Sequence, residues 1–327
     1  MSDPVISVTR RLPPELEREI RREFPSARLS IDDRPLGRDG LEHLLDYADV
    51  ILPTVTDAFP ADLLHRGVRT RLLANFGVGV DHIDLDAARQ AGVTVTNTPG
   101  VLTDSTADHA VMLMLMAARR AGEGEREVRS GGWTGWRPTH LLGRDLRGRT
   151  LGIVGMGRIG CAVARRAADG LGMRVVWVGR DSGESSPAGI EARCTSSLDE
   201  LLGEADVVSL HAPGSEQNRH LIDHRRLELM RPSAILVNTA RGDLVDTAAL
   251  VDVLKRERIA GAGLDVYEGE PSVAPELLEL ENVVLLPHLG SATYETRLAM
   301  GRLALENIRA FLDGAELPSP VIECAAD

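Results

Sequence analysis

The amino-acid sequence predicts an α/β protein with two domains, each built around a doubly wound parallel sheet. The chain has 327 residues, enough for two domains of about 100–200 residues each. Short apolar runs, bounded by polar or turn residues, alternate with helix-like stretches along most of the chain. Strands that are separated by helices pair in parallel through crossover connections. Because apolar residues make up 43% of the chain, each sheet can be covered by a sizeable core.

Residues 1–100 carry the elements of the first domain. Residues 5–12 are expected to form a strand, and Pro13 and Pro14 then open a helical stretch that runs to Glu23. Further strands are expected at 48–54, 70–78 and 92–97, each a short apolar run.

The second domain is expected to begin with one long buried helix at 104–120, for which Asp104 or Ser105 can provide the cap. A loop rich in Gly and Trp follows at 131–138. A last helix near 293–312 is expected to cross back to the first domain. Between these segments, strands are expected at 150–156, 174–178, 206–212, 233–240, 261–266 and 282–288, with a helix at 158–168.

The charge of the chain argues against a nucleic-acid partner. The formal net charge is −12 and the pI is near 5.3, whereas the neutralisation of phosphates needs a basic face. This net charge does not exclude an anionic substrate, because a single Arg can dominate the field in a closed pocket.

The cysteines and the apolar runs indicate a cytoplasmic protein with no membrane partner. Cys161, Cys194 and Cys324 lie far apart and form neither a disulfide framework nor a metal-ligand pattern, which favours a reducing compartment. No cluster of His, Cys and Asp has zinc spacing, so no metal is expected. The N-terminus lacks the apolar core of a signal peptide, and the longest apolar run, 110–118, is shorter than the about 20 residues of a membrane span.

A glycine loop predicts a dinucleotide site. Gly155, Gly157 and Gly160 form the pattern G-x-G-x-x-G after an apolar strand and at the start of a helix. Gly155 permits a tight turn, Gly157 lets the backbone approach a pyrophosphate, and Gly160 lets helix and strand pack closely. The helix N-terminus adds N–H groups and a positive dipole end that suit phosphate. Ordinary turns also match this pattern, but the strand and helix around it favour the dinucleotide site.

The domain containing this loop is therefore expected to be a Rossmann cofactor domain at 101–290. The last helix returns to the first domain, so residues 1–100 and 291–327 together are expected to form a flavodoxin-like substrate domain.

The end of the second strand of this domain favours NADPH over NADH, although NADH remains possible. An NAD site usually has an acidic residue there to bind the ribose hydroxyls. In this chain Gly179 stands at that position and Arg180 follows, and an Arg can pair with the 2′-phosphate of NADPH. Ser182 could add a hydrogen bond. In the alternative interpretation Arg180 is a solvated loop charge and Asp181 binds the ribose.

Three residues near strand ends can supply the chemistry of a carbonyl reduction. Arg241 can bind a carboxylate bidentately, and the alternative for it is a surface ion pair. His288 can donate the proton that a carbonyl needs in addition to a hydride. Glu270 is expected to hydrogen-bond His288 and to favour the charged imidazole, and the alternative is an exposed turn charge. His82 could approach the same region, but the sequence shows no obvious partner for it.

The sequence resembles the D-isomer-specific 2-hydroxyacid dehydrogenase family across nearly its whole length. The matching runs are FGVGVDHID, TPGVLTDSTADHAV, GIVGMGRIG, NTARGDLVD, DVYEGEP and LPHLGSAT. Within the family the chain is most similar to the glyoxylate/hydroxypyruvate reductases. GGWTGWRPTHLLG is similar to their Trp-rich loop, and GRDS is similar to the NADP-type ending of the second strand. NADP-using relatives often carry a second basic residue shortly after the Arg, where this chain has Asp181, Ser182 and Glu184.

The resemblance implies roles for particular residues. Arg241, Glu270 and His288 would be the catalytic set, and the N–H groups of Val78 and Gly79 would hold the substrate carboxylate beside Arg241, with His288 also contacting the substrate. Besides His288, the implied cofactor contacts beyond the glycine loop are Thr106, Arg158, Ile159, Thr239, Ala240, Asp265 and Gly290. The resemblance also implies a homodimer, with the helix near Ala110 at the interface and with Trp133 and Trp136 reaching the partner's active site.

The expected activity is NADPH-dependent reduction of a small 2-oxo acid, glyoxylate to glycolate or hydroxypyruvate to D-glycerate. A broader D-2-hydroxyacid or 2-ketogluconate reductase is the first alternative, since it differs only in pocket width. A nicotinamide-sensing regulatory protein is an alternative of another class, but it would not need the complete Arg–Glu–His set.

Overall fold

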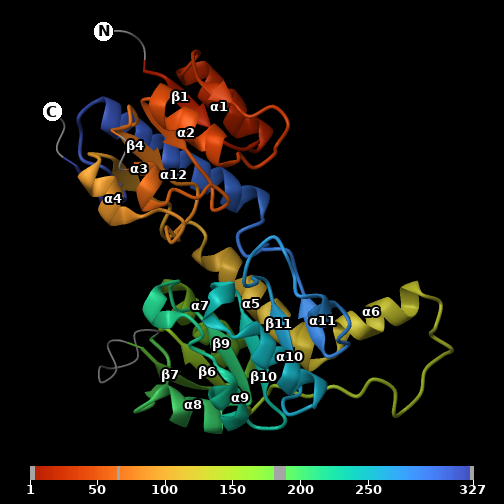
Figure 1. Cartoon of the computed structure of the whole chain (residues 1–327). Coiled ribbons are helices and arrows are strands. Elements are labelled where there is room, and N and C mark those ends of the chain that lie inside the picture. The colour runs from red at the N-terminus through yellow and green to blue at the C-terminus, as the bar shows by residue number, and fades with distance from the viewer. Residues whose placement is uncertain (1–3, 65–66, 180–188, 325–327) are drawn as a thin grey trace. The chain divides into compact units, whose positions relative to one another are not determined.

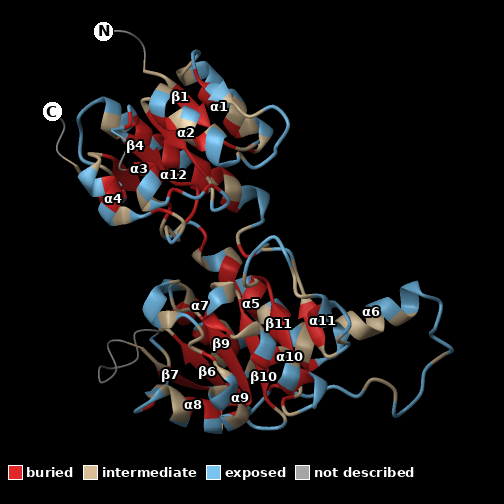
Figure 2. Ribbon diagram, viewed as in Figure 1, coloured by how far each residue is buried: buried red, intermediate tan, exposed pale blue. Residues whose placement is uncertain are grey.

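The chain divides into two units (Figure 1). The computed structural model describes residues 4–64, 67–179 and 189–324. Unit 1 comprises Met1–Leu102 and Ser291–Asp327, and unit 2 comprises Thr103–Gly290. In each unit the buried residues are concentrated in the strands and on the helix faces that cover them (Figure 2).

The sheet of unit 1 has six strands in the order β13-β5-β4-β3-β1-β2. The strands are β1 (Ile6–Val8), β2 (Arg28–Leu29), β3 (Val50–Leu52), β4 (Leu72–Ala74), β5 (Thr94–Thr96) and β13 (Pro320–Ile322). The helices are α1 (Pro14–Glu23), α2 (Arg38–Tyr47), α3 (Ala61–Leu64), α4 (Leu85–Gln90) and α12 (Tyr294–Leu312). The strands β1, β3, β4 and β5 are buried at every position, as is typical of a parallel sheet covered on both faces. β13 differs, because it pairs with β5 in the antiparallel direction.

Unit 1 joins segments from both ends of the chain. β13 supplies one edge strand of the sheet, and α12 packs on α1 so closely that a Cβ at Gly301 would lie 1.9 Å from a methyl carbon of Leu16. Thr293 caps α12 by accepting a hydrogen bond from the N–H of Thr296. The expected last helix therefore forms, and it packs within unit 1.

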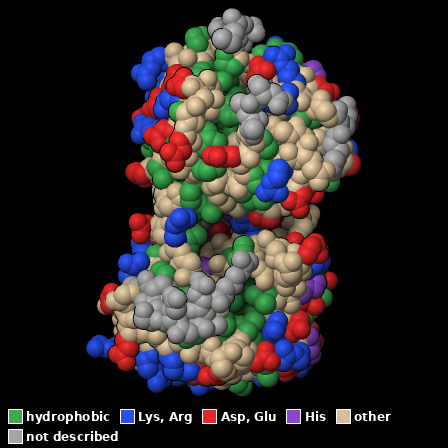
Figure 3. Space-filling view, turned by 90° about the vertical axis from the view of Figure 1, so that its left-hand side faces the viewer, with side chains coloured by type: hydrophobic (Ala, Val, Ile, Leu, Met, Phe, Trp, Pro, Cys, Tyr) green, Lys and Arg blue, Asp and Glu red, His purple; other side chains and the backbone are tan. Residues whose placement is uncertain are grey.

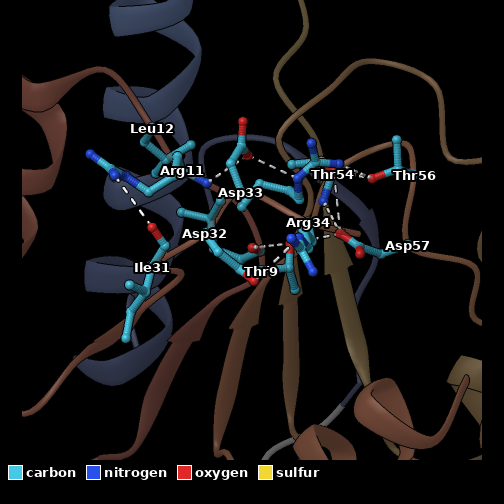
Figure 4. A network of polar contacts seen from close by, with 12 residues as sticks. Thr9, Arg11, Leu12, Ile31, Asp32, Asp33, Arg34, Thr54, Thr56 and Asp57 are labelled. Carbon is cyan, nitrogen blue, oxygen red and sulfur yellow. Dashed lines mark hydrogen bonds and ion pairs between the residues drawn. The ribbon is translucent and has the colours of Figure 1, made fainter. Parts of the chain in front are cut away.

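A buried carboxylate ties together the loops after β1 and β3 (Figure 4). Asp57 is fully buried, and its Oδ2 accepts hydrogen bonds from Thr9 Oγ1 at 2.6 Å and from the N–H of Thr54 at 2.8 Å. Thr54 then forms a parallel bridge with Phe76, in the loop that follows β4. The carboxyl edge of this sheet is thereby held in place up to the loop that contains Val78 and Gly79.

Unit 2 contains a seven-stranded parallel sheet in the order β12-β11-β10-β9-β6-β7-β8. Its strands are β6 (Thr150–Val154), β7 (Arg174–Val178), β8 (Ala192–Cys194), β9 (Val207–Leu210), β10 (Ile235–Asn238), β11 (Gly261–Leu264) and β12 (Val283–Leu285). The chain runs outward from β6 to β8 and then returns to β9 on the other side of β6. The sheet therefore has its topological switch point between β6 and β9, where doubly wound folds bind ligands.

Helices cover both faces of this sheet. The helices of unit 2 are α5 (Thr103–Ala118), α6 (Ala121–Arg129), α7 (Arg158–Arg165), α8 (Leu198–Glu204), α9 (His224–Leu229), α10 (Thr247–Lys255) and α11 (Pro275–Leu278). Of these, α6 buries none of its residues and does not cover the sheet. One apolar cluster includes Leu113 of α5 and Val163 of α7, and a separate one includes Leu201 of α8 and Leu250 of α10. The predicted α/β fold class with two doubly wound sheets is confirmed.

Two details of the predicted helices are wrong. α5 begins at Thr103, so Asp104 and Ser105 lie inside its first turn and neither caps it; Asp104 instead forms an ion pair with Arg166 at 2.8 Å. The helix predicted at 158–168 keeps α-helical hydrogen bonding only to Arg165 and continues as a π-helical turn over Arg166–Gly170.

Candidate active site

Arg241, Glu270 and His288 all follow neighbouring strands of unit 2. Arg241 lies three residues after β10, Glu270 six residues after β11, and His288 three residues after β12. Because β10, β11 and β12 are adjacent and parallel, their carboxyl ends meet at one edge of the sheet.

Glu270 and His288 are joined by a hydrogen bond. His288 Nδ1 lies 2.8 Å from Glu270 Oε2, and the other carboxylate oxygen accepts the N–H of Tyr267 at 2.9 Å. An ionised carboxylate only accepts hydrogen bonds, so the Nδ1 of His288 carries a hydrogen in this pair. The second ring nitrogen, Nε2, takes no part in this hydrogen bond. Both side chains are about 35% exposed, so this imidazole is not sealed inside the protein.

Nearby groups keep Glu270 ionised. Burial raises the pKa of Glu270. This effect is outweighed by the hydrogen bonds from His288 and from the N–H of Tyr267, and by the positive charges of His288 and Arg241. The pKa of Glu270 therefore lies below its usual value. Glu270 is therefore a carboxylate at neutral pH, as a partner for an imidazolium must be.

The backbone at His288 makes a sharp turn that Asp265 holds. His288 has φ +56°, a conformation that few non-glycine residues adopt. Its N–H donates to the backbone oxygen of Asp265 at 2.9 Å, and the next two N–H groups, of Leu289 and Gly290, donate to the Asp265 carboxylate at 2.7 and 2.8 Å. His109 Nε2 on α5 lies 3.0 Å from the same carboxylate, although the two atoms are not aligned as a hydrogen bond.

A glycine allows the Arg241 loop to approach the segment that leads to Glu270. A Cβ at Gly242 would lie 1.9 Å from the carbonyl carbon of Tyr267, so a side chain does not fit there. The buried side chain of Asn238 holds the same loop, because its Nδ2 donates to the backbone oxygen of Arg241 at 2.8 Å and its Oδ1 accepts the N–H of Ala240 at 3.0 Å.

The three glycines of the dinucleotide loop differ in their surroundings. Gly155 has φ +96°, and a Cβ there would lie 2.8 Å from the backbone oxygen of His211. A Cβ at Gly160 would lie 2.2 Å from the backbone oxygen of Gly155. These two glycines serve close packing. Gly157 precedes α7, and a Cβ there would meet no atom of the described residues within 4 Å. The open space at Gly157, beside the exposed Arg158 and the half-buried Ile159, suits the approach of a pyrophosphate.

The other predicted cofactor contacts of unit 2 fall into two groups. A Cβ at Gly290 would lie 3.4 Å from both Asp265 Oδ2 and a methyl carbon of Thr106, so these three residues lie together. Thr239 and Ala240 directly follow β10, and the buried Oγ1 of Thr239 has no hydrogen-bond partner in the described part of the chain. A polar cofactor could supply the partner that this hydroxyl lacks.

The residues predicted to select NADPH, Arg180 and Ser182, lie outside the described residues. Gly179 is described, and a Cβ there would lie 3.7 Å from the backbone nitrogen of Met156 in the glycine loop. The end of β7 is therefore next to that loop, as the sequence prediction requires.

Val78 and Gly79 lie in the loop that follows β4 in unit 1, and both are partly exposed. The sequence showed no obvious partner for His82, and in the structure its Nε2 lies 3.1 Å from Oδ1 of the buried Asn75. Sequence analysis also missed Asn75 itself, although a polar residue directly after a buried strand is a signal for such a role.

Two further residues near the unit 2 site were missed. His211 follows β9 at the switch point, with Nε2 2.9 Å from Ser209 Oγ, and burial lowers the pKa of His211 to about 4, so it is neutral at physiological pH. Burial, and the charges of Asp265 and Glu270, raise the pKa of Tyr267 to about 12. Its hydroxyl donates to the backbone oxygen of Leu286 at 2.8 Å, just before the turn that carries His288.

On the face shown in Figure 3, basic and acidic side chains of the described residues are intermingled, and no concentrated basic patch is seen there. Among the described residues, no helix is long and apolar enough to cross a membrane, and no group of His, Cys, Asp and Glu is arranged to hold a metal ion.

Comparisons with known proteins identify the family. Residues 111–290 match the model of the D-isomer specific 2-hydroxyacid dehydrogenase, NAD binding domain. The chain is 43% identical to a glyoxylate reductase of Thermococcus litoralis over 323 residues, which cover 98% of this chain and 96% of that protein.

Solved structures of related enzymes have the same fold. A glyoxylate reductase from Paecilomyes thermophila is 34% identical, with a TM-score of 0.85 and coverage of 98% of this chain and 99% of that one. An NADPH-dependent glyoxylate/hydroxypyruvate reductase from Sinorhizobium meliloti, in complex with NADP and malonate, is 32% identical, with a TM-score of 0.84 and full coverage of both chains. The chain therefore belongs to the D-isomer-specific 2-hydroxyacid dehydrogenase family and is an NAD(P)-dependent enzyme of that class.

Proposed function

We propose that the protein reduces glyoxylate or hydroxypyruvate with NADPH, and that His288 is the proton donor. The observation that carries this proposal is the 2.8 Å hydrogen bond between His288 and an ionised Glu270, within the field of Arg241. The name of the Thermococcus litoralis relative supports glyoxylate as the substrate. The name of the Sinorhizobium meliloti enzyme supports hydroxypyruvate as a substrate and NADPH as the cofactor.

The described residues fit a nicotinamide cofactor. Among the described residues, Gly157 leaves open space at the start of α7, the hydroxyl of Thr239 has no hydrogen-bond partner, and Asp265 and Thr106 meet beside Gly290. In this proposal the glycine loop and the start of α7 hold the pyrophosphate, and the residues around Asp265 hold the nicotinamide end. When bound, the reduced nicotinamide supplies the hydride that C2 of the 2-oxo acid receives.

The residues of this chain then have separate tasks. Arg241 binds the carboxylate and polarises the neighbouring carbonyl, and the N–H groups of Val78 and Gly79 bind the same carboxylate. His288 carries a proton on Nε2 and gives it to the carbonyl oxygen as the alkoxide forms, while Glu270 stabilises the imidazolium before the transfer. One hydride and one proton are added, and the product is the 2-hydroxy acid.

We propose that the protein works as a cytoplasmic homodimer. Residues 121–142 carry apolar side chains that are strongly exposed, with Val128 at 62%, Trp136 at 83% and Leu142 at 64%. Met112 and Leu115 are exposed on the neighbouring α5, whereas Ala110 itself is buried within unit 2. A concentration of exposed apolar residues is typical of a protein interface. Free cysteines support a reducing compartment.

A panel of short 2-oxo acids with NADPH and with NADH tests the activity. We expect kcat/KM to be highest for glyoxylate or hydroxypyruvate, and NADPH to exceed NADH by about tenfold or more, because Arg180 can pair with the 2′-phosphate. Arg180→Gln should remove most of this preference and leave the rate with NADH unchanged. Equal or higher kcat/KM with NADH in the unaltered protein contradicts the assignment of NADPH.

His288→Gln should lower kcat by about 10²–10⁴-fold, because an amide cannot donate a proton to the alkoxide. The affinity for NADPH, followed by the fluorescence of the nicotinamide, should stay near that of the unaltered protein. His224→Gln, a change on the exposed surface of α9, is the matched control and should leave kcat unchanged. Substantial turnover by His288→Gln would exclude His288 as the donor.

Glu270→Gln should move the alkaline limb of the kcat/KM profile to lower pH. The amide keeps a hydrogen-bond acceptor for His288 but has no charge, so the proposed proton donor loses the carboxylate that supports it. Steady-state rates between pH 5 and 10 give the profile. The exposed Glu279→Gln is the control, and an unmoved limb in Glu270→Gln argues against the pairing.

Sedimentation velocity should give the mass of two copies of the 35.3 kDa chain. Trp136→Asp combined with Leu142→Asp should dissociate this dimer, because two charges would be placed within an apolar contact. Ile31→Asp changes an equally exposed apolar residue of unit 1 and should leave the mass unchanged. A monomer mass for the unaltered protein would refute the proposed assembly.

A further inference from the structure

Two side-chain amides bind the backbone of the loop after β4 in unit 1. Asn75 Nδ2 donates to the backbone oxygens of Gly77 at 3.1 Å and Gly79 at 3.0 Å. Asn97 Nδ2 donates to the backbone oxygen of Val78 at 2.8 Å. Three successive carbonyl groups of one short loop are therefore held by two asparagines, and Asn75 is fully buried.

This arrangement fixes the direction of two N–H groups. In a trans peptide the C=O and the following N–H point in opposite directions. Because the carbonyls of Gly77 and Val78 point at the asparagine amides, the N–H groups of Val78 and Gly79 point away from them. Neither N–H donates a hydrogen bond within the described chain. Successive free N–H groups of this kind suit an anion such as a carboxylate.

His82 fixes the orientation of Asn75. A carbonyl oxygen only accepts hydrogen bonds, so the nitrogen of the Asn75 amide must face Gly77 and Gly79. The Oδ1 of Asn75 then faces His82 Nε2 at 3.1 Å, and this nitrogen must donate. The backbone oxygen of His82 accepts the N–H of Phe59 at 2.8 Å, which anchors the histidine to the neighbouring loop.

Asn97 is anchored in a comparable way. Its backbone oxygen accepts a hydrogen bond from Ser319 Oγ at 2.6 Å, and its N–H donates to the backbone oxygen of Ser319 at 3.2 Å. Ser319 in turn contacts the buried Asn307 of α12. The direction of the loop therefore depends on hydrogen bonds that extend from β4 to the last helix of the chain.

We propose that Asn75, His82 and Asn97 are positioning residues that aim the N–H groups of Val78 and Gly79 at the substrate carboxylate. This inference rests on the proposed function, because it takes these two N–H groups as part of the substrate site. None of the three side chains needs to contact the substrate. Loss of their hydrogen bonds frees the peptide planes to rotate, so the affinity for the carboxylate falls. The groups that transfer the proton and the hydride are not altered.

Asn75→Asp is the main test, because it keeps the shape of the side chain but replaces the donor with an oxygen that repels two carbonyls. We expect the KM for glyoxylate to rise by about tenfold or more and kcat to change much less, as for loss of a binding interaction made equally in the ground and transition states. The KM for NADPH should stay constant. The dissociation constant of oxamate, an unreactive 2-oxo acid analogue, should rise by a similar factor in calorimetric titrations.

His82 provides a second, milder test. His82→Leu removes the donor and should raise the KM for glyoxylate and weaken the binding of oxamate. His82→Gln places an amide N–H near the same point and should give a smaller rise in this KM. Thr70→Val is the matched control, since Thr70 is also buried in unit 1 and donates hydrogen bonds to Leu45 and Ala48 outside this loop. It should lower stability without changing the KM.

The outcomes separate the two proposals. Unaltered KM and oxamate affinity in folded Asn75→Asp or His82→Leu would overturn the positioning role and leave the proposed function standing. The same KM rise in Thr70→Val as in Asn75→Asp would overturn it too, since the effect would then follow stability alone. An unaltered protein that neither turns over a 2-oxo acid nor binds oxamate would overturn both proposals.

Discussion

The buried carboxylate of Asp265 is the constraint on which the unit 2 site depends. A non-glycine residue in the left-handed region costs about 1–3 kcal/mol, so His288 would not hold its backbone conformation unaided. Hydrogen bonds to a charged group contribute about 1.5–3 kcal/mol each, and Asp265 accepts two of them from the residues directly after His288. These bonds exceed the cost of the strained residue and fix the direction of the imidazole.

The electrostatics of the site follow from this anchoring. Once His288 is fixed, its Nδ1 meets Glu270, and the carboxylate stays ionised despite its partial burial because His288 and Arg241 add positive charge. Positive charge from Arg241 and His288 thus lies beside Glu270 at one edge of a sheet, in a chain whose net charge is −12.

The sequence was sufficient for those features that depend on local pattern. The strands β6, β7 and β9 to β12 of unit 2 and the meeting of Glu270 with His288 follow from apolar runs and from residues placed at strand ends, whereas β8 was not predicted. β7 has its predicted bounds, and the other predicted strands of unit 2 are shorter in the structure, because residues at their ends form connecting loops. His288, for example, lies three residues beyond its strand rather than at the end of it.

Features that depend on distant segments could not be predicted in this way. β13 begins with Pro320, which cannot donate within a ladder and suggests a turn, yet it forms an antiparallel edge strand beside β5. The partner of His82 is an asparagine on the preceding strand end, and only the folded loop brings the two together. Asp104 has the chemistry of a cap, but Thr103 already belongs to the helix and Arg166 provides another partner.

The composition of unit 1 from both chain ends has a consequence for biosynthesis. Ribosomes synthesise a polypeptide from its amino terminus onward, and domains generally fold as units during synthesis. Residues 103–290 form one contiguous piece and can complete their sheet as soon as they emerge. Residues 1–102 emerge earlier, yet the edge of β5 and the surface under α12 stay uncovered until residues 291–327 have been translated. The earliest part of this chain to be made is thus the last to acquire its complete fold.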